Sequence, residues 1–204
     1  MDISLKIKNR WGYLIAFLML LISYFLIFFI IKKLAKEAER VSHSYDVINN
    51  LESIKAEITD AETGVRGYAI TKDVRYLKPY NTGSKKVTAL YRQLVNLTTD
   101  NQSHKDKIDS LGKMIDKRLL DLSDFITQFQ RGGFVITEDI LSSREANNRV
   151  MEKIRDLVEK LKGDEQVLMN KRNSKLDGFF TSTTIIAVIS LLIALVTIFY
   201  SLIT

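Results

Sequence analysis

The chain has 204 residues, with 30 Lys and Arg against 24 Asp and Glu, so it carries a net charge of +6. Its basic residues are spread along the chain with acidic residues between them, and this pattern argues against nucleic-acid binding, which needs a basic patch. Cysteine is absent, so disulfides and thiol chemistry are excluded.

The first predicted element is a membrane-spanning helix at residues 11–31. This run is apolar and uncharged, and about 20 helical residues suffice to cross a bilayer core about 30 Å thick. Trp11 and Tyr13 stand at one end of the run, as aromatic residues do at membrane interfaces. Lysines rather than a signal-peptide cleavage site follow it. Residues 1–10 are the predicted cytoplasmic N-terminal segment.

Four amphipathic helices are predicted within residues 32–178. Apolar residues recur there at spacings of three and four, which is typical of helices that share a core. The four apolar stripes are Val41, Tyr45, Ile48, Leu51, Ile54, Ile58, Ala61, Val65 and Tyr68; Leu77, Tyr80, Val87, Leu90, Leu94 and Leu97; Ile108, Leu111, Ile115, Leu119, Leu122, Phe125 and Phe129; and Val150, Ile154, Leu157, Leu161 and Leu168.

Turn-forming residues separate these helices at three places, namely residues 71–73 with Pro79, residues 99–103, and residues 131–134. Asp100 or Ser103 is the expected N-cap of the third helix, and Thr137 that of the fourth. Gly132 and Gly133 suit a left-handed end to the third helix.

The last predicted element is a second membrane-spanning helix at residues 179–204. No helix-breaking residue separates it from the fourth helix, or residues 11–31 from the first. The first and fourth helices are therefore expected to run unbroken into the membrane, with the second and third helices shorter. The predicted fold is all-α: an antiparallel four-helix bundle at residues 32–178 whose long outer helices continue into two transmembrane helices.

Four helices bring the chain back to the membrane that it left, so the predicted protein passes twice through the cell inner membrane. Both termini are expected in the cytoplasm and the domain in the periplasm or outside, although charge supports this orientation only weakly, since basic residues flank both ends of the first span. A stalk of only two helices would leave apolar stripes uncovered, and pairing with a second copy would cover them. We therefore expect a homodimer anchored in the lipid bilayer.

One segment departs from simple helical periodicity. It has the form D-x-E-T-G-x-R-G-Y, then a T-x-D turn and Y-L-x-P-Y, and its residues are Asp60, Glu62, Thr63, Gly64, Arg66, Gly67, Tyr68, Thr71, Asp73, Tyr76, Leu77, Pro79 and Tyr80. A later E-x-x-L-x-x-x-R is formed by Glu165, Leu168 and Arg172. This ordered series resembles the third subtype of the CHASE domains, over about residues 41–172.

The resemblance implies an extracytoplasmic four-helix sensory domain that precedes a histidine kinase, cyclase or chemotaxis-type output. The given chain ends at Thr204, so it is interpreted either as the input portion of a longer receptor, with a two-component sensor histidine kinase expected, or as a stand-alone membrane protein. The alternative function is a structural or interaction protein of the envelope that does not switch. The family has no single ligand type, so the extracytoplasmic ligand or protein partner stays unspecified.

The motif admits two interpretations. Gly64 and Gly67 share a helix face and allow close approach of a helix or an aromatic ring, while Glu62 and Arg66 can pair one turn apart. In the structural interpretation, which the sequence favours, a buried Arg66 ties down a distal corner filled by Tyr68 and Tyr80. In the functional one, Arg66 is the centre of a ligand site.

Helix rise places possible partners along the bundle. Counting at 1.5 Å per residue from the membrane brings Arg66 level with Glu145 of the fourth helix. Glu165 lies much nearer the membrane, so Arg172 or a basic residue of the first helix is its expected partner.

Enzymatic chemistry finds no support in the sequence. His43 and His104 are both expected to be solvated. No glycine-rich phosphate loop, metal-ligand spacing or nucleophilic triad is found. We therefore expect no catalytic residue, no metal and no cofactor in residues 1–204.

Overall fold

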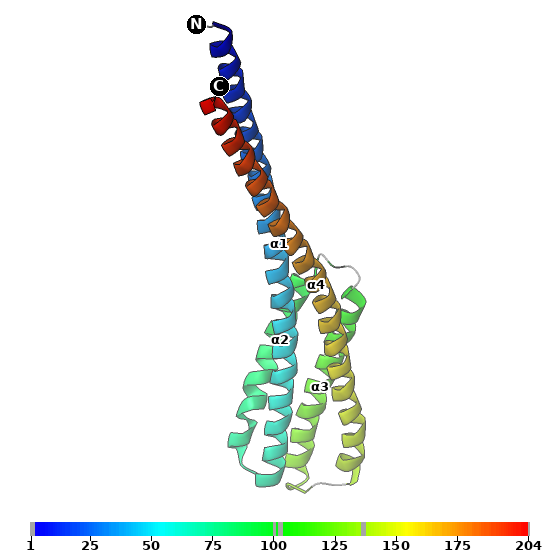
Figure 1. Cartoon of the computed structure of the whole chain (residues 1–204). Coiled ribbons are helices and arrows are strands. Elements are labelled where there is room, and N and C mark those ends of the chain that lie inside the picture. The colour runs from blue at the N-terminus through cyan, green and yellow to red at the C-terminus, as the bar shows by residue number, and fades with distance from the viewer. Residues whose placement is uncertain (1–2, 100, 102–103, 136–137, 204) are drawn as a thin grey trace. The chain divides into compact units, whose positions relative to one another are not determined.

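The computed structural model describes residues 3–99, 101, 104–135 and 138–203; the side chains of residues 3–13, 15, 16, 138–148, 198 and 201–203 are not described. Four α-helices and a short 3-10 helix follow in the order α1 (Ile3–Thr71), η1 (Val74–Leu77), α2 (Lys78–Leu97), α3 (Lys105–Arg131) and α4 (Glu138–Ile203) (Figure 1). The described residues contain no strand. The predicted all-α class is confirmed.

The chain divides into two compact units, one made of residues 1–42 and 169–204 and the other of residues 43–168. Helices α1 and α4, of 69 and 66 residues, each pass through both units without a break, as the sequence predicts. Helices α2 and α3 have only 20 and 27 residues. Within residues 43–168 neighbouring helices run in opposite directions and form a four-helix bundle (Figure 1).

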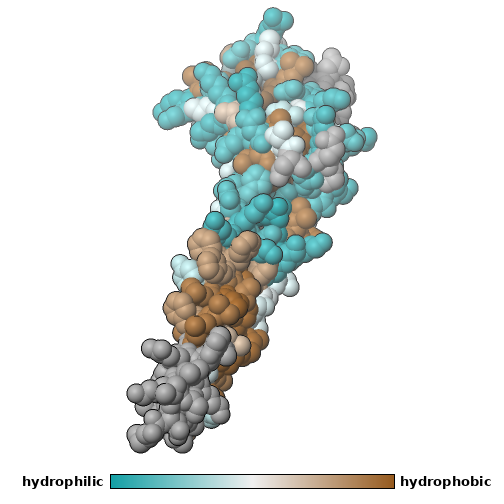
Figure 2. Space-filling view, turned by 90° about the horizontal axis from the view of Figure 1, so that it is seen from above, coloured by the Kyte–Doolittle hydropathy of each residue, from teal (hydrophilic) through white to brown (hydrophobic). Residues whose placement is uncertain are grey.

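The unit formed by residues 1–42 and 169–204 presents apolar side chains outward. Phe29 of α1 and Val196 of α4 are both about two-thirds exposed, and the most apolar stretch of each helix buries none of its residues within the chain. Figure 2 shows this apolar surface in brown, whereas the visible face of the bundle is largely teal. Both helices are long and apolar enough to cross a membrane.

The bundle has two apolar core clusters, of which the larger involves all four helices. The larger cluster is formed by Val47, Leu51, Ile54 and Ile58 of α1, Val87 and Leu94 of α2, Ile108, Leu111 and Ile115 of α3, and Val150, Met151, Ile154, Val158 and Leu161 of α4. A second cluster, at the end of the bundle where α1 meets η1, consists of Ala61, Val65, Tyr68, Leu77, Leu122 and Phe129. Spacings of three and four along each helix place these residues on one face.

Buried polar residues also occupy positions within these core stripes. Ser44, Arg118 and Glu165 are each at most 4% exposed, and each continues the three-four spacing of its helix: Ser44 before Val47, Arg118 between Ile115 and Leu122, and Glu165 after Leu161. The predicted stripe was wrong at Tyr45, which is half exposed. Leu119 is partly buried and packs against the core, and Leu168 is partly buried.

The helix ends match the predicted breaks. At the end of α3, Gly133 has φ +69°, Phe134 N donates to Phe129 O (2.9 Å) and Gly133 N donates to Gln130 O (3.3 Å). These are the two hydrogen bonds of a Schellman motif, and the Phe129 and Phe134 rings, 5.6 Å apart, supply its apolar contact. The predicted left-handed end is confirmed. The predicted caps Asp100, Ser103 and Thr137 lie outside the described residues.

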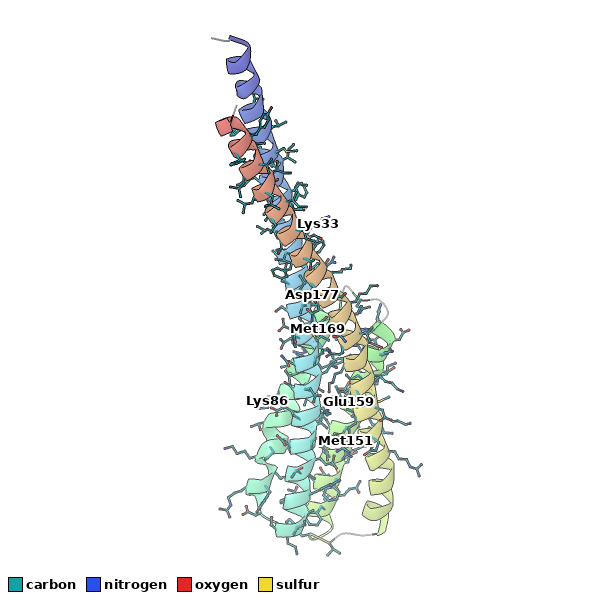
Figure 3. All side chains as sticks on the ribbon, in the orientation of Figure 1. Lys33, Lys86, Met151, Glu159, Met169 and Asp177 are labelled. Atoms are coloured by element: carbon teal, nitrogen blue, oxygen red, sulfur yellow. The ribbon has the colours of Figure 1, made fainter. Side chains whose placement is uncertain are left out.

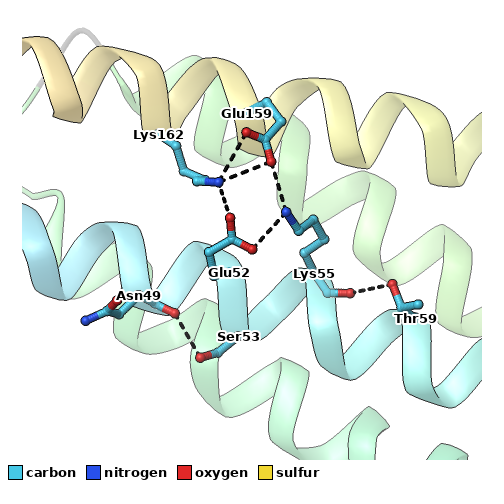
Figure 4. A network of polar contacts seen from close by, with 7 residues as sticks. All are labelled: Asn49, Glu52, Ser53, Lys55, Thr59, Glu159 and Lys162. Atoms are coloured by element: carbon cyan, nitrogen blue, oxygen red, sulfur yellow. Dashed lines mark hydrogen bonds and ion pairs between the residues drawn. The ribbon is translucent and has the colours of Figure 1, made fainter.

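Four charged side chains connect α1 and α4 on the bundle surface (Figure 4). Lys55 lies 2.8 Å from Glu52 and 2.9 Å from Glu159, while Lys162 lies 3.1 Å from Glu159 and also pairs with Glu52. Each lysine therefore bridges the two helices. We call these four residues the α1–α4 charge network.

Candidate functional site

Two glycines of the motif make room for the segment that follows it. A Cβ atom on Gly64 would lie 2.6 Å from the backbone oxygen of Tyr76, and one on Gly67 would lie 2.6 Å from the Tyr76 ring. Pro79 also contacts Gly64, at 3.3 Å from the same added atom. The G-x-x-G and Y-L-x-P-Y halves of the motif are thus the two sides of one close contact, as expected for glycines that admit an aromatic ring.

The turn between these halves is held by its own side chains. Thr71 Oγ1 accepts from Asp73 N (3.2 Å), and Asp73 accepts from Arg75 through both the backbone N (2.9 Å) and Nε (2.7 Å). The Arg75 guanidinium, together with its backbone N–H, lowers the pKa of Asp73. Lys72 adopts φ +61°, a left-handed conformation in which glycine is usual. The T-x-D pattern therefore ends α1 and starts η1.

Glu62 is the charged centre of the corner. It is buried, and its carboxylate pairs with Arg66 one turn along α1 and with Arg118 of α3 at 2.9 Å. The predicted pairing of Glu62 with Arg66 is confirmed. The Arg66 side chain is 53% exposed, however, whereas that of Arg118 is only 4% exposed. The buried arginine that ties two helices together is therefore Arg118, and its assignment to Arg66 was wrong.

Aromatic side chains fill the corner beside this ion pair. Tyr68 is buried and packs edge-on against Phe129, with ring centroids 5.8 Å apart, and its hydroxyl accepts from Gln130 Nε2 at 3.0 Å. Tyr80 packs against the same cluster and is partly buried. Both tyrosines thus lie where the structural interpretation expects them.

The remaining motif residues differ in exposure. Leu77 is buried in the corner cluster. Asp60 and Thr63 are exposed, and the Thr63 hydroxyl donates to the Thr59 carbonyl of its own helix (2.9 Å). Tyr76 is 47% exposed beyond its contact with Gly67. The Glu145 side chain, proposed as a partner of Arg66, lies outside the described residues.

A second polar cluster joins α1, the start of α3 and α4. Ser44 Oγ donates to Glu165 Oε2 at 2.7 Å, and His104 Nδ1 lies 3.4 Å from Glu165 Oε1. All three side chains are buried. Glu165 therefore has different partners from those expected, and the expectation that His104 is solvated was wrong. Arg172, the expected partner, donates from Nη1 to the Arg40 carbonyl at 2.7 Å.

This Ser44–Glu165–His104 cluster is arranged for holding helices together. In a hydrolytic triad the imidazole lies between the hydroxyl and the carboxylate, whereas here the carboxylate lies between Ser44 and His104. On the outer side, Asp164 accepts from Lys107 of α3 at 2.5 Å. Among the described residues no group of three His, Cys, Asp or Glu side chains has metal-binding geometry.

The geometry and the motifs agree with a comparison against known families. A family model of the CHASE3 domain matches residues 37–175, which is most of the chain and includes both clusters. The chain belongs to the CHASE3 family. CHASE3 domains are non-catalytic sensory domains of the extracellular type, typical of signalling receptors. Searches of curated proteins and of solved structures found no match.

Three residues of these clusters were not identified from the sequence, because each is a polar side chain in a buried position. Ser44, His104 and Arg118 lie outside the family motif. A signal was nevertheless present for two of them: Ser44 lies three residues before Val47, and Arg118 three after Ile115, so each falls on the helical face of the core. His104 precedes α3 and gives no such signal.

Proposed function

We propose that this CHASE3 domain is the membrane-anchored, extracytoplasmic input module of a signalling receptor, with a two-component sensor histidine kinase as the expected output. Helices α1 and α4 would cross the inner membrane, with both termini in the cytoplasm. Binding of an extracytoplasmic ligand or protein would shift α1 against α4. The observation that carries the proposal is the continuity of both helices from the apolar segments into the sensory bundle.

The geometry suggests how a shift could be transmitted. The contacts between α1 and α4 are mainly side-chain contacts, namely apolar packing, the Ser44–Glu165 hydrogen bond and the α1–α4 charge network. Helix displacements of about 1–2 Å are a common switching motion at such interfaces. Because each helix is one hydrogen-bonded rod, a displacement within the bundle would move the whole helix.

Topology is the first feature to test, and the absence of cysteine makes the test direct. A single cysteine would be introduced in the intact chain as Lys113→Cys, on the exposed surface of α3, or as Lys6→Cys, near the N-terminus. In intact cells whose outer membrane has been permeabilised, a maleimide that cannot cross the inner membrane should label the Lys113→Cys protein only. Labelling of both proteins after the inner membrane is opened is the control. Labelling of Lys6→Cys in intact cells, or protection of Lys113→Cys, would refute the proposed orientation.

A further inference from the structure

Basic residues gather beside the apolar segments of α1 and α4, on the side toward the sensory domain. We call them the basic collar: Lys32, Lys33, Lys36 and Arg40 of α1, and Lys171, Arg172 and Lys175 of α4. All seven lie in the unit formed by residues 1–42 and 169–204. Residues 32–42 and 169–178 also contain Glu37, Glu39 and Asp177, so these two segments carry a net charge of +4.

The collar lies at the height of lipid headgroups. Headgroup layers are about 5–8 Å thick on each side of the hydrocarbon core, and a helix rises 1.5 Å per residue. Lys32, Lys33 and Lys36 lie within about 8 Å of the end of the first apolar run, and Lys175 lies about 6 Å from the start of the second. Figure 3 labels Lys33 on α1 in this region. The other three collar residues lie about 10–14 Å from the apolar runs, just beyond this layer.

The lysines of the collar are available to an external anion. Lys33, Lys36, Lys171 and Lys175 are exposed and form no ion pair within the described part of the chain. Lys32 is also exposed, with its Nζ 4.8 Å from the centroid of the Phe28 ring, one turn into the apolar run. A lysine in this position keeps its stem on apolar surface and its ammonium at the interface. The collar thus presents several ammonium groups in or near the headgroup layer beside two apolar helices.

The charge distribution calls for a physical reason. Residues 1–10 and residues 32–42 each carry a net charge of +2, so the flank of α1 on the domain side is as basic as its N-terminal flank, although basic flanks are typical of the cytoplasmic side. Anionic headgroups attract basic residues at a membrane surface by an amount that corresponds to about fivefold in affinity per residue.

We propose that the basic collar binds the headgroups of anionic phospholipids in the leaflet that faces the sensory domain. This inference rests on the proposed function in one respect, since α1 and α4 must span the membrane. Beyond that function, it names anionic phospholipids as a ligand class of the chain. Their abundance in the membrane would then affect the ends of α1 and α4 that lie next to the sensory domain.

The test uses the full chain reconstituted in phosphatidylcholine vesicles that contain a minor fraction of phosphatidylglycerol. Spin-labelled phosphatidylglycerol and phosphatidylcholine report the association constant of each lipid at the protein surface. The collar variant is Lys32→Gln/Lys33→Gln/Lys36→Gln/Lys175→Gln. Its control removes the same charge from exposed positions of the bundle: Lys85→Gln/Lys113→Gln/Lys117→Gln/Lys160→Gln.

We expect the unmodified chain to prefer phosphatidylglycerol and the control variant to keep that preference. The preference should fall at least about fivefold in the collar variant, the effect of a single basic residue at the surface. An undiminished preference in the collar variant, or an equal loss in the control, would overturn the proposal. A preference abolished by inorganic phosphate would overturn the lipid assignment in favour of a free anion.

Failure of this inference is distinguishable from failure of the proposed function. Extraction of the vesicles with alkaline carbonate shows whether the chain is embedded in the bilayer. A chain that is extracted does not span the membrane, which would refute the proposed function itself. A chain that stays embedded but shows no preference for phosphatidylglycerol would refute the collar alone.

Discussion

At the scale of single residues, the CHASE3 motif forms a corner whose parts depend on one another. The glycines admit Tyr76, Asp73 holds the turn, and Glu62 links α1 to α3 through Arg118. A buried ion pair contributes little net stability, but loss of one partner leaves the other charge buried and uncompensated. The corner is therefore more sensitive to single substitutions than to paired ones.

Replacement of Arg118 tests this dependence. Arg118→Met should lower the free energy of unfolding by about 1–3 kcal/mol, because the buried Glu62 carboxylate loses its cross-helix partner and keeps only the half-exposed Arg66. The double variant Glu62→Gln/Arg118→Met should recover much of this loss, since the buried negative charge is then removed. Unfolding of the chain in detergent, followed by circular dichroism, gives both values. Arg66→Gln is the control and should cost at most about 1 kcal/mol because Arg66 is exposed. A larger cost for Arg66→Gln than for Arg118→Met would contradict the assignment.

The glycines permit a second test with a control in the same chain. Gly64→Ala should destabilise the bundle by about 1–3 kcal/mol, because the added methyl group meets the Tyr76 backbone at 2.6 Å and the η1 turn must shift. Gly163→Ala in α4 meets no atom within 4 Å, so it should stabilise by about 0.5–1 kcal/mol through helix propensity alone. The same unfolding measurement compares them. Equal effects of the two substitutions would show that Gly64 has no packing role.

At the scale of helices, much of the fold could be predicted and part of the site could not. The breaks after Thr71, Leu97 and Arg131 follow from turn and cap chemistry, and the helix count follows from the apolar spacing. Hydropathy alone did not reveal the polar core positions: Ser44 and Arg118 continue the helical spacing of the core, but the partners that make their burial possible, Glu165 and Glu62, lie on other helices. Hydropathy describes each residue by itself, whereas the burial of a polar side chain depends on a hydrogen-bond or ion-pair partner that is distant in the sequence.

The α1–α4 charge network makes a prediction about pH. Hydrogen bonds from Lys162 and Lys55 lower the pKa of Glu52, and those from Lys55 and Lys162 lower that of Glu159, below the ordinary value of 4.5. Contact with Glu52 raises the pKa of Lys55 and of Lys162 above 10.5. The carboxylates therefore stabilise the bundle above about pH 4.5 and lose this effect as the pH falls through their folded values. The lysines act fully below pH 10.5 and lose their effect as the pH rises further.

Unfolding measured from neutral pH down to about pH 3 should thus show a loss of stability that is smaller in Glu52→Gln/Glu159→Gln. The network is partly exposed, so the difference should be about 1 kcal/mol and should shrink in high salt. Glu152→Gln is the matched control, since Glu152 pairs only with Arg155 of its own helix at 2.9 Å in the described structure. A pH profile unchanged by the network variant would show that these pairs do not couple α1 to α4.

If signals pass along continuous helices, the output should depend on the rotational phase of α1 and α4, that is, on which way each helix face points. One, two or three residues inserted beside Lys36 in α1 or Lys171 in α4 rotate the following helix by about 100° per residue. Signalling output measured in the natural host should therefore change with the number inserted, and seven added residues, close to two full turns, should restore much of it. A steady decline with insertion length, without recovery at seven, would argue against transmission through unbroken helices.

At the scale of the whole molecule, the remaining question is whether two copies act together. Outside the collar lysines, the helix segments next to the apolar runs keep apolar side chains only partly covered, among them Leu34, Val41 and Leu176. A second copy would cover such surface with a symmetric interface. The prediction is that the chain is a homodimer paired along residues 32–42 and 169–178.

Single cysteines introduced as Ala38→Cys or Ser174→Cys should form disulfide-linked dimers in membranes under mild oxidation, whereas Leu120→Cys, on the exposed face of α3, should not. Because disulfides need Cα atoms within about 7 Å, neighbouring positions in each segment should be scanned, and the yield should rise and fall with the helical period. A flat, low yield across both segments, or an equal yield at Leu120→Cys, would show that the two copies do not pair there.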